Sequence, residues 1–382
     1  MSRIIISCAP RISPYVLQEL ETLGYRGRTL NKLGVEMEGT MQDAMKLNLH
    51  LRCASKVLLE VRSFSATDPD ALYAELSSIA WERMIPSNGY LRIESFVKND
   101  TILDTRFANL KAKDAIVDRI QKTKGRRPDS GPSVDRTVLF LHWVENDAGI
   151  YINTSGDTIG KHGYRKVPFR APMMESLAAA TLLASRWDKN SHFINPMCGS
   201  GTLAIEAALL ACHIAPGSFR TNYGFIHLRS YDERLWKKLL NEAKNKVPED
   251  LEFRIIATDR DPRAIEAAKM NAEQAGVKHL IDFKVCDFRD TFIPRSNPGV
   301  IFFNPEYGER LGEEKRLEGI YKSIGDFFKQ HCKGYTGYIF TGNLDLAKHV
   351  GLKAKRRIEF FNAKIDARLL EYEIYSGSKK RI

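Results

Sequence analysis

Four consecutive residues, Asn304-Pro305-Glu306-Tyr307, carry the most informative chemistry of this sequence, because they directly follow the apolar run Val300–Phe303. They place an amide, a rigid backbone carbonyl and an aromatic ring at the end of an expected buried strand. Those groups suit a site that methylates the flat amino group of a nucleic-acid base. A strand that runs into an ordinary proline turn is the alternative interpretation.

A second motif runs from Asn195 to Thr202 and follows an expected strand over 191–195. Gly199 and Gly201, separated by one small residue, let the backbone approach a ligand beside the N-terminus of the next helix. The third glycine of a dinucleotide site is missing, since Ala204 stands there, and the sequence has no phosphate loop for a nucleoside triphosphate. We therefore expect a nucleoside without phosphates, namely S-adenosylmethionine.

Two further strand ends carry groups that match a nucleoside. Asp259 follows the expected strand 253–258 and is a candidate acceptor for both ribose hydroxyls. Asp287 and Phe288 follow the expected strand 281–286, and offer an acceptor for an exocyclic amine and a ring that stacks on a base. Each aspartate alone is also a common helix cap or turn residue. Since ligands of open parallel sheets bind beyond the carboxyl ends of the strands, we expect these ends to meet at one site.

The helices and strands expected to position these residues follow different patterns in the two halves of the chain. The first half predicts two small α+β modules, with strands over 3–8, 35–38, 57–64, 90–96, 138–144 and 150–155 and helices over 13–23, 41–53, 70–80 and 109–121. The second half alternates strands (191–195, 253–258, 281–286, 300–303, 337–341) with helices (202–212, 262–275, 315–332), and ends in an antiparallel pair, 357–361 and 368–375. This alternation predicts an α/β class with a doubly wound, mostly parallel sheet. Residues 214–250 are too many for a simple connection.

Composition is that of a globular protein with a polyanionic partner. The chain of 382 residues has 58 Lys and Arg against 47 Asp and Glu, a net charge of +11. No apolar run approaches a membrane span and the N-terminus lacks signal-peptide features, so we expect a cytoplasmic protein. The six cysteines are widely spaced without zinc-ligand spacing, so we expect reduced thiols and no metal.

Basic residues concentrate between Arg106 and Arg136, where nine basic residues face four acidic ones. They crowd an expected helix and the loop after it, and the candidates for phosphate contacts are Lys111, Lys113, Lys122, Lys124, Arg126 and Arg127. A solvated helix face is the alternative interpretation of such a run.

Several of these motifs together resemble one family. Residues 195–202 and 304–311, with His162-Gly163-Tyr164-Arg165 and 171–179, are similar to class I methyltransferases that join a THUMP RNA-binding domain to a Rossmann-like catalytic domain. The strongest likeness is to bacterial enzymes that methylate the exocyclic N2 of a guanine in 23S ribosomal RNA. Residues 110–118 and 126–128 are similar to the THUMP part, and 214–217 to an insertion typical of the family.

The resemblance implies three domains: a ferredoxin-like module over 1–56, a THUMP domain over 57–157 and a methyltransferase domain with a seven-stranded sheet over 158–382. It also implies the site residues. Cofactor contacts would come from Asn195, Met197, Cys198, Gly199, Ser200, Gly201, Asp259, Asp287, Phe288 and Asn304. Catalysis would come from Asn304, Pro305 and Tyr307, and Arg165 would lie near the cofactor or the RNA.

Two positions depart from the family pattern. Asn195 stands where the family usually has Asp, which weakens an acceptor for the cofactor's ammonium group. Glu306 stands where the usual tetrapeptide has a second proline, which places a carboxylate beside the target base.

The sequence thus predicts a methyltransferase acting on RNA, with 23S ribosomal RNA preferred over tRNA. Alternatives are a tRNA guanine-N2 methyltransferase, an N6-adenine DNA methyltransferase, whose target amine is of the same kind, and an inactive RNA-binding assembly factor.

Overall fold

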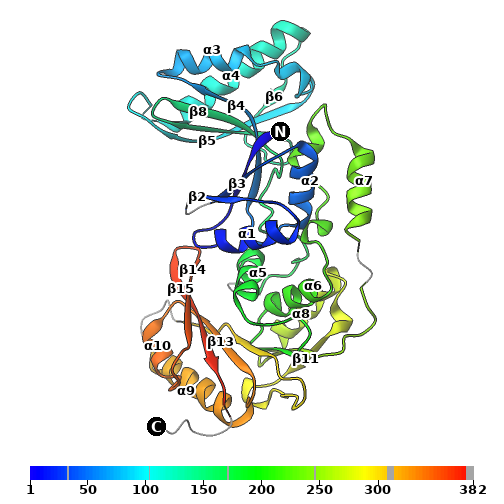
Figure 1. Ribbon diagram of the computed structural model, residues 1–382, viewed down its shortest axis with the longest axis vertical. Helices are drawn as coiled ribbons and strands as arrows, with labels where there is room; N and C mark the ends of the chain where they lie inside the picture. Colours follow the sequence, from blue (N-terminus) through cyan, green and yellow to red (C-terminus); the bar gives the residue numbers. More distant parts are fainter. Residues whose placement is uncertain (32–33, 103, 170–171, 245–246, 308–313, 376–382) are drawn as a thin grey trace. The chain divides into compact units, whose positions relative to one another are not determined.

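The computed structural model describes residues 1–31, 34–102, 104–169, 172–244, 247–307 and 314–375 (Figure 1). The chain divides into two compact units. Unit 1 comprises Met1–Cys8, Val16–Ile159 and Arg220–Ala243, and unit 2 comprises Ala9–Tyr15, Gly160–Phe219 and Lys244–Ile382.

Unit 1 is built on one sheet with the strand order β2-β3-β1-β4-β8-β7-β5-β6. The strands are β1 (Ser2–Ser7), β2 (Arg28–Asn31), β3 (Gly34–Gly39), β4 (Lys56–Ser65), β5 (Tyr90–Lys98), β6 (Asp129–Ser130), β7 (Thr137–Val144) and β8 (Asp147–Asn153). The long strand β4 pairs with β1 through its first residues and with β8 along its length. The two α+β modules predicted for the first half therefore share a continuous sheet.

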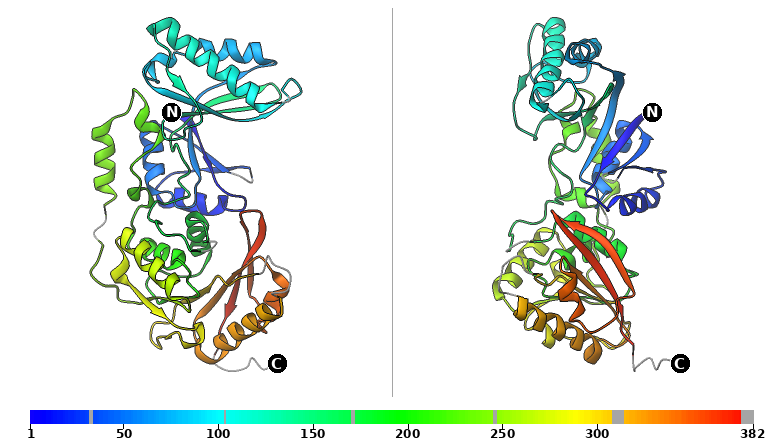
Figure 2. Two further views of the ribbon diagram at one scale, coloured as in Figure 1. Left: turned by 180° about the vertical axis from the view of Figure 1, so that it is seen from behind. Right: turned by 90° about the vertical axis from the view of Figure 1, so that its left-hand side faces the viewer.

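The helices of unit 1 include α2 (Met41–His50), α3 (Pro69–Ser78), α4 (Thr105–Lys124) and α7 (Glu233–Glu242). Helix α1 (Ser13–Thr22) is divided between the units, because its first three residues are grouped with unit 2. Helices α3 and α4 lie side by side over one face of the sheet (Figures 1 and 2). Asp104 caps the start of α4, and Gly125 ends it with a φ of 69°, a left-handed conformation that favours glycine. The basic helix predicted over 109–121 thus exists and is longer at both ends.

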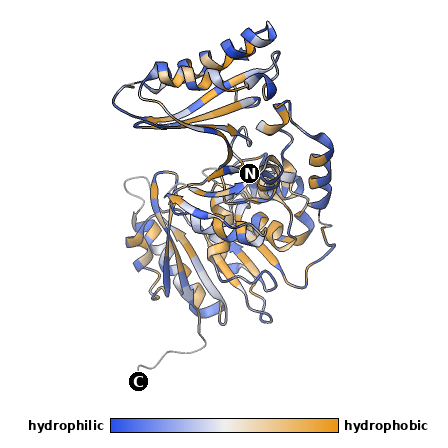
Figure 3. Cartoon of the chain, turned by 45° about the horizontal axis from the view of Figure 1, so that its top comes forward, coloured by the Kyte–Doolittle hydropathy of each residue, from blue (hydrophilic) through white to orange (hydrophobic). Residues whose placement is uncertain are grey.

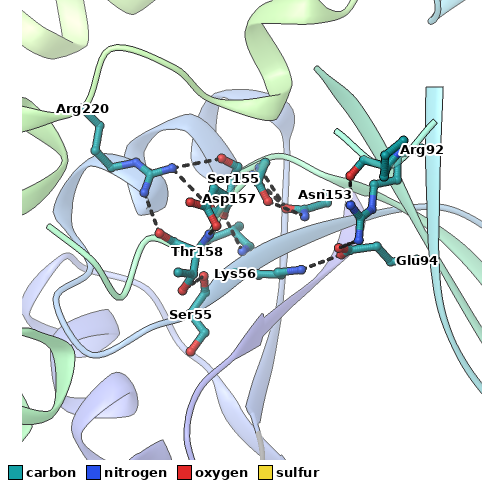
Figure 4. A network of polar contacts seen from close by, with 12 residues as sticks. Ser55, Lys56, Arg92, Glu94, Asn153, Ser155, Asp157, Thr158 and Arg220 are labelled. Carbon is teal, nitrogen blue, oxygen red and sulfur yellow. Dashed lines mark hydrogen bonds and ion pairs between the residues drawn. The ribbon is translucent and has the colours of Figure 1, made fainter. Parts of the chain in front are cut away.

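Residues 220–243, inside the long connection noted in the sequence, group with unit 1 and contain α7. Arg220 begins this segment, and its guanidinium donates to the carbonyls of Ser155, Asp157 and Thr158, in the loop after β8 (Figure 4). The side chain of Asn153 holds the same loop, accepting from two backbone N–H groups at 3.1 Å. The segment was assigned by sequence to the domain 158–382, and those domain boundaries stay a prediction.

Unit 2 contains a seven-stranded sheet with the order β11-β10-β9-β12-β13-β15-β14. The strands are β9 (Phe193–Pro196), β10 (Ile255–Asp259), β11 (Ile281–Val285), β12 (Val300–Phe303), β13 (Thr336–Thr341), β14 (Arg356–Asn362) and β15 (Ile365–Glu373). The first five strands in this order run parallel, whereas β15 pairs antiparallel with both β13 and β14. The predicted α/β class, the mostly parallel sheet and the antiparallel closing pair are confirmed.

The helices of unit 2 include α5 (Glu175–Ala184), α6 (Thr202–Ala211), α8 (Pro262–Gln274), α9 (Glu314–His331) and the short α10 (Leu344–Lys348). Of these, α5 and α10 were not among the predicted elements. The four residues of β12 are buried and apolar, as are most residues of β9, and hydrophobic colour marks many of the strands (Figure 3). Phe303 of β12 packs edge-on against Phe327 and Phe328 of α9. This packing fixes the strand end from which the Asn304 tetrapeptide begins.

None of the helices in the described residues is both long and apolar enough to span a membrane.

Candidate active site

A cavity of about 510 Å³ lies in unit 2 at the carboxyl ends of the parallel strands. Ten predicted residues line it: Asn195 in β9, Met197, Cys198, Gly199 and Ser200 after β9, Asp259 at the end of β10, Asp287 and Phe288 after β11, and Asn304 and Pro305 after β12. A volume of this size suits a small-molecule ligand. The structure therefore brings together four strand ends that are far apart in the sequence, from Asn195 to Pro305.

The glycine loop after β9 is tied to β10 through its backbone. The Gly199 N–H donates to Oδ2 of Asp259 at 3.0 Å, and the Cys198 N–H donates to the Thr258 carbonyl at 2.9 Å. Gly201 has a φ of 82°, and a Cβ there would lie 2.9 Å from the Cβ of Ala268 in α8. Gly201 is absent from the residues that line the cavity. Its glycine is required by close packing of two helices, and its cofactor contact stays a prediction.

Two carboxylates of the cavity, Asp259 and Asp287, are oriented by hydrogen bonds from neighbouring groups. Asp259 also accepts from the Asp261 N–H at 2.9 Å, so both of its oxygens are oriented by backbone groups. The Arg289 side chain donates to Asp287 at 2.7 Å, and this hydrogen bond holds the pKa of Asp287 below its ordinary value. Phe288 packs edge-on against Phe303 at 5.6 Å, which fixes its ring beside Asp287.

Two amide oxygens at the cavity have no hydrogen-bond partner among the described residues. The Asn195 amide donates to the Phe302 carbonyl at 2.8 Å, whereas its Oδ1 is buried and unpaired. Oδ1 of Asn304 is likewise buried without a partner. Buried polar atoms are normally hydrogen-bonded, so both oxygens indicate a ligand that brings donors. The two carboxylates and the two unpaired oxygens are acceptors, which fit the donors of an amino-acid nucleoside and of a base amine.

The rest of the tetrapeptide is placed differently. Glu306 lines the cavity, and its Oε2 accepts from Nη2 of Arg316 at 2.9 Å. Tyr307 is not among the lining residues: its hydroxyl accepts from the Asn362 amide at 2.5 Å, and its ring lies against Gly342. Base stacking by Tyr307 stays a prediction. Residues 308–311, the remainder of the motif, lie outside the described residues.

Arg165 is placed within unit 2 and is largely buried. Its side chain is 13% exposed and donates to Oγ1 of Thr202 at 3.0 Å and to the Met173 carbonyl, and it pairs with Glu175 at 3.3 Å. Thr202 and Met173 both line the cavity. The side chain therefore supports the cavity wall, and this arrangement does not favour the predicted RNA contact.

A buried polar cluster behind the cavity was not assigned from sequence. Oε1 of Glu206, on α6, lies 2.7 Å from Nδ1 of His162 and accepts from the Tyr164 hydroxyl at 2.8 Å. Burial, and then the neighbouring carboxylates, raise the pKa of Tyr164 well above its ordinary value. The available signal was a single glutamate within the apolar helix run 203–210, which requires polar partners when buried.

The six basic residues that were predicted to contact phosphates along α4 and just after it divide into two groups. Those along the first part of α4 are paired: Lys111 with Asp70 at 2.8 Å and Lys113 with Asp114 at 3.2 Å, while Arg127 beyond the helix lies 3.3 Å from Asp114. Lys122, Lys124 and Arg126, around the end of α4, are exposed and make no ion pair within the described part of the chain.

A metal centre is not indicated. Within the described ranges, no three His, Cys, Asp or Glu side chains gather as metal ligands. All six cysteines are free thiols, and burial raises the pKa of Cys198 well above its ordinary value.

Comparison with family models decides the family. Residues 162–371 match the model described as the RMKL-like methyltransferase domain. The chain belongs to this methyltransferase family. Residues 3–58 match the RlmL ferredoxin-like domain and residues 66–153 match the THUMP domain. The predicted family, a THUMP-containing class I methyltransferase, is confirmed.

Curated relatives are similar over nearly all of this chain. A ribosomal RNA large subunit methyltransferase K/L of Syntrophotalea carbinolica is 36% identical, over 96% of this chain and 53% of that protein. The protein of the same name from Methylococcus capsulatus is 34% identical, over 98% of this chain and 52% of its own length. The chain thus spans about half the length of the curated relatives it matches.

Solved structures match at full length. SMU.472, determined as a complex with SAH, superposes with a TM-score of 0.87 at 28% identity, covering 99% of both chains. A protein from Listeria monocytogenes described as a predicted N6-adenine-specific DNA methylase has a TM-score of 0.85 at 29% identity, covering 97% of this chain and 96% of its own. SAH is what remains of S-adenosylmethionine after methyl transfer, in agreement with the predicted cofactor.

Proposed function

We propose that this protein transfers a methyl group from S-adenosylmethionine to the exocyclic N2 amine of a guanine in RNA, with 23S ribosomal RNA as the preferred substrate, in the cytoplasm. One observation carries the proposal: the buried, unpaired Oδ1 of Asn304 lies in a cavity that also contains the Pro305 backbone and two oriented carboxylates. An acceptor without a donor is what a substrate amine would satisfy.

The amine needs activation because its lone pair is delocalised into the purine ring. Oδ1 of Asn304 and the Pro305 carbonyl would accept its two N–H bonds and leave the lone pair directed at the methyl group. Proline restricts φ and so holds that carbonyl in place. When bound, the cofactor supplies a methyl group on a positively charged sulfur. As the N–C bond forms, the S–C bond breaks with its electrons going to sulfur, and the nitrogen loses a proton to solvent. Positioning of the two reactants supplies most of the rate gain.

The remaining cavity groups would hold the cofactor. Asp259 would accept from the ribose hydroxyls and Asp287 from the adenine amine, while Phe288 would border the adenine ring. The second unpaired oxygen, Oδ1 of Asn195, would face the ammonium of the methionine end. This amide oxygen carries no charge, unlike the usual aspartate, but it can still accept a hydrogen bond from the ammonium group.

The RNA would be recognised by unit 1. Its match to the THUMP domain supports an RNA partner, and the curated relatives are large-subunit ribosomal RNA methyltransferases by name. The exposed cations around the end of α4 would contact phosphates, because they make no ion pair with the described residues.

Methyl transfer from labelled cofactor into 23S ribosomal RNA, tRNA and DNA, followed by nucleoside analysis, tests the proposal. We expect N2-methylguanosine from ribosomal RNA; label in tRNA alone would redirect the substrate assignment. In parallel, calorimetry should show that Asp259→Ala weakens cofactor binding by about tenfold to a hundredfold, the worth of hydrogen bonds to a charged group. Asp282→Ala is the matched control, because Asp282 lies on the neighbouring strand β11 and pairs with Arg254.

An N6-adenine DNA methyltransferase is the second candidate, favoured by the description of the Listeria relative. Adenine offers an amine of the same kind to Asn304 and Pro305. N6-methyladenine as the sole product would establish this candidate and exclude the guanine assignment. An inactive RNA-binding factor would show neither product and no calorimetric binding of the cofactor.

A further inference from the structure

Beside the acceptors for the amine, the cavity wall carries an ion pair that the methyl-transfer chemistry does not use. Glu306 and Arg316 both line the cavity, and their side chains meet at 2.9 Å. Both are half exposed, at 51% for Glu306 and 44% for Arg316. Glu306 directly follows Pro305 in the chain, and it lines the same cavity as Asn304 and Pro305.

The edges of purines differ in the groups next to the amine. On guanine, the N2 amine is followed by the N1–H donor and then by the O6 acceptor. On adenine, the N6 amine is followed by N1, which carries a lone pair and accepts. A carboxylate beside the amine-binding acceptors attracts the guanine N1–H and repels the adenine lone pair.

We propose that Glu306 is a specificity residue that selects guanine by accepting its N1–H, while Arg316, held in place by Glu306, donates to O6. This inference rests on the proposed function and names the determinant of its substrate. An ionised carboxylate has about four acceptor sites on its two oxygens, so Glu306 can accept from a base while it accepts from Arg316. An acceptor and a donor that lie side by side on the wall complement the adjacent N1–H donor and O6 acceptor of the guanine edge.

The ion pair also serves the RNA. A lone carboxylate at a nucleic-acid site would repel phosphates, whereas the guanidinium of Arg316 compensates that charge at 2.9 Å. Discrimination comes from both terms, an attractive contact to guanine and a repulsive one to the wrong edge. Because the pair is half exposed, we expect kcat/KM to favour guanine over a base without N1–H and O6 by about tenfold to a hundredfold, as for hydrogen bonds to charged groups.

The test uses a fragment of 23S ribosomal RNA around the guanine that methyl mapping identifies, and the same fragment with 2-aminopurine at that position. 2-Aminopurine keeps the N2 amine but lacks N1–H and O6. Its fluorescence rises when it leaves the base stack, which reports entry into the site without turnover. The full chain is compared with Glu306→Gln and with Glu318→Gln, a half-exposed glutamate of α9 that does not line the cavity.

We expect the wild-type protein to methylate the guanine fragment with a kcat/KM about ten to a hundred times higher than the aminopurine fragment. Glu306→Gln should lower this ratio at least tenfold and tighten the fluorescence-detected binding of the aminopurine fragment, because its amide donates to the unprotonated N1. Glu318→Gln should leave the ratio unchanged.

Three results would overturn the inference: an unchanged ratio in an active Glu306→Gln protein, an equal loss with both fragments, or the same change in Glu318→Gln. These differ from failure of the proposed function, in which the wild-type protein forms no N2-methylguanosine in any ribosomal RNA. That result would remove both proposals.

Discussion

The cavity of unit 2 and the basic helix α4 of unit 1 were both predicted from sequence as functional, yet the fold treats them differently. At the cavity, Oδ1 of Asn195 and Oδ1 of Asn304 are buried without a partner among the described residues. On α4, the charges of Lys111 and Lys113 are already met by Asp70 and Asp114. Polar groups that a fold buries and leaves unsatisfied indicate a ligand strongly, whereas paired surface charges indicate little.

The largest effect should come from removing the unpaired acceptor. Asn304→Ala should lower kcat for methyl transfer by about 10²–10³, the usual cost of one preorganised hydrogen-bonding group at a reacting centre. Cofactor affinity should change by less than about threefold, because Asp259 and Asp287 remain. Single-turnover methyl transfer and calorimetry measure the two quantities separately.

Asn190→Ala is the control for this experiment, since Asn190 is exposed in the same unit and away from the cavity. Full activity in Asn304→Ala would mean that another group accepts the amine protons. The contrast between the two regions would then lose its main support.

The cavity was largely predictable because apolar runs mark strands, and parallel strands place their carboxyl ends at one edge. What lies beyond a strand end was less predictable. The ring of Tyr307 is placed by Gly342 and Asn362, residues distant in the chain, and Gly201 is required by Ala268 of α8. Sequence spacing carries no record of such contacts.

Unit 1 illustrates the same limit. A helix was predicted over 109–121, whereas α4 begins after its cap Asp104 and ends at Gly125, so only its ends differ from the prediction. Which of its cations are paired depends on Asp70 of α3, which the fold brings alongside. Arg165 was expected near the cofactor or the RNA, and its RNA contact stays a prediction. Its pairing with Glu175 could not be read from the sequence, because Glu175 belongs to α5, a helix that was not predicted.

Removing the cations around the end of α4 that make no ion pair within the described residues sharpens the comparison. The triple variant Lys122→Ala, Lys124→Ala, Arg126→Ala should weaken RNA binding and reduce the slope of log K against log salt by up to about 2 to 3, if each cation contacts one phosphate. The matched triple Lys111→Ala, Lys113→Ala, Arg127→Ala should reduce it by less, because ion pairs already engage these residues. Filter binding of 23S ribosomal RNA fragments at several salt concentrations measures both slopes. Equal slopes for the two triples would show that pairing in the free protein does not decide RNA contact.

A smaller effect concerns the buried cluster behind the cavity. Tyr164→Phe removes the hydroxyl that donates to Glu206, and should lower the free energy of unfolding by about 1–3 kcal/mol, the cost of depriving a buried acceptor of a partner. The pKa of Tyr164, raised by burial, keeps this donor protonated also at alkaline pH, where an ordinary tyrosine would ionise. Urea unfolding measures the change. Tyr321→Phe is the control, because it breaks a hydrogen bond between two uncharged hydroxyl groups, those of Tyr321 and Thr341, at 2.7 Å. It should lower the free energy of unfolding by less than Tyr164→Phe does. A larger loss in Tyr321→Phe would show that the bond to the Glu206 carboxylate has no special importance for stability.

The smallest effect should come from Tyr307→Phe, which separates the ring from its hydroxyl. If the ring stacks on the base, as the sequence predicts, phenylalanine keeps that contact, and methyl transfer should fall by less than about threefold through the lost bond to Asn362. Tyr307→Ala should then cost about tenfold to a hundredfold in kcat/KM, the worth of one stacked base. If the ring only packs against Gly342, both variants should leave kcat/KM nearly unchanged and lower stability instead. Kinetics and unfolding of the same two proteins therefore decide whether Tyr307 belongs with the groups that await a ligand or with those that the fold already satisfies.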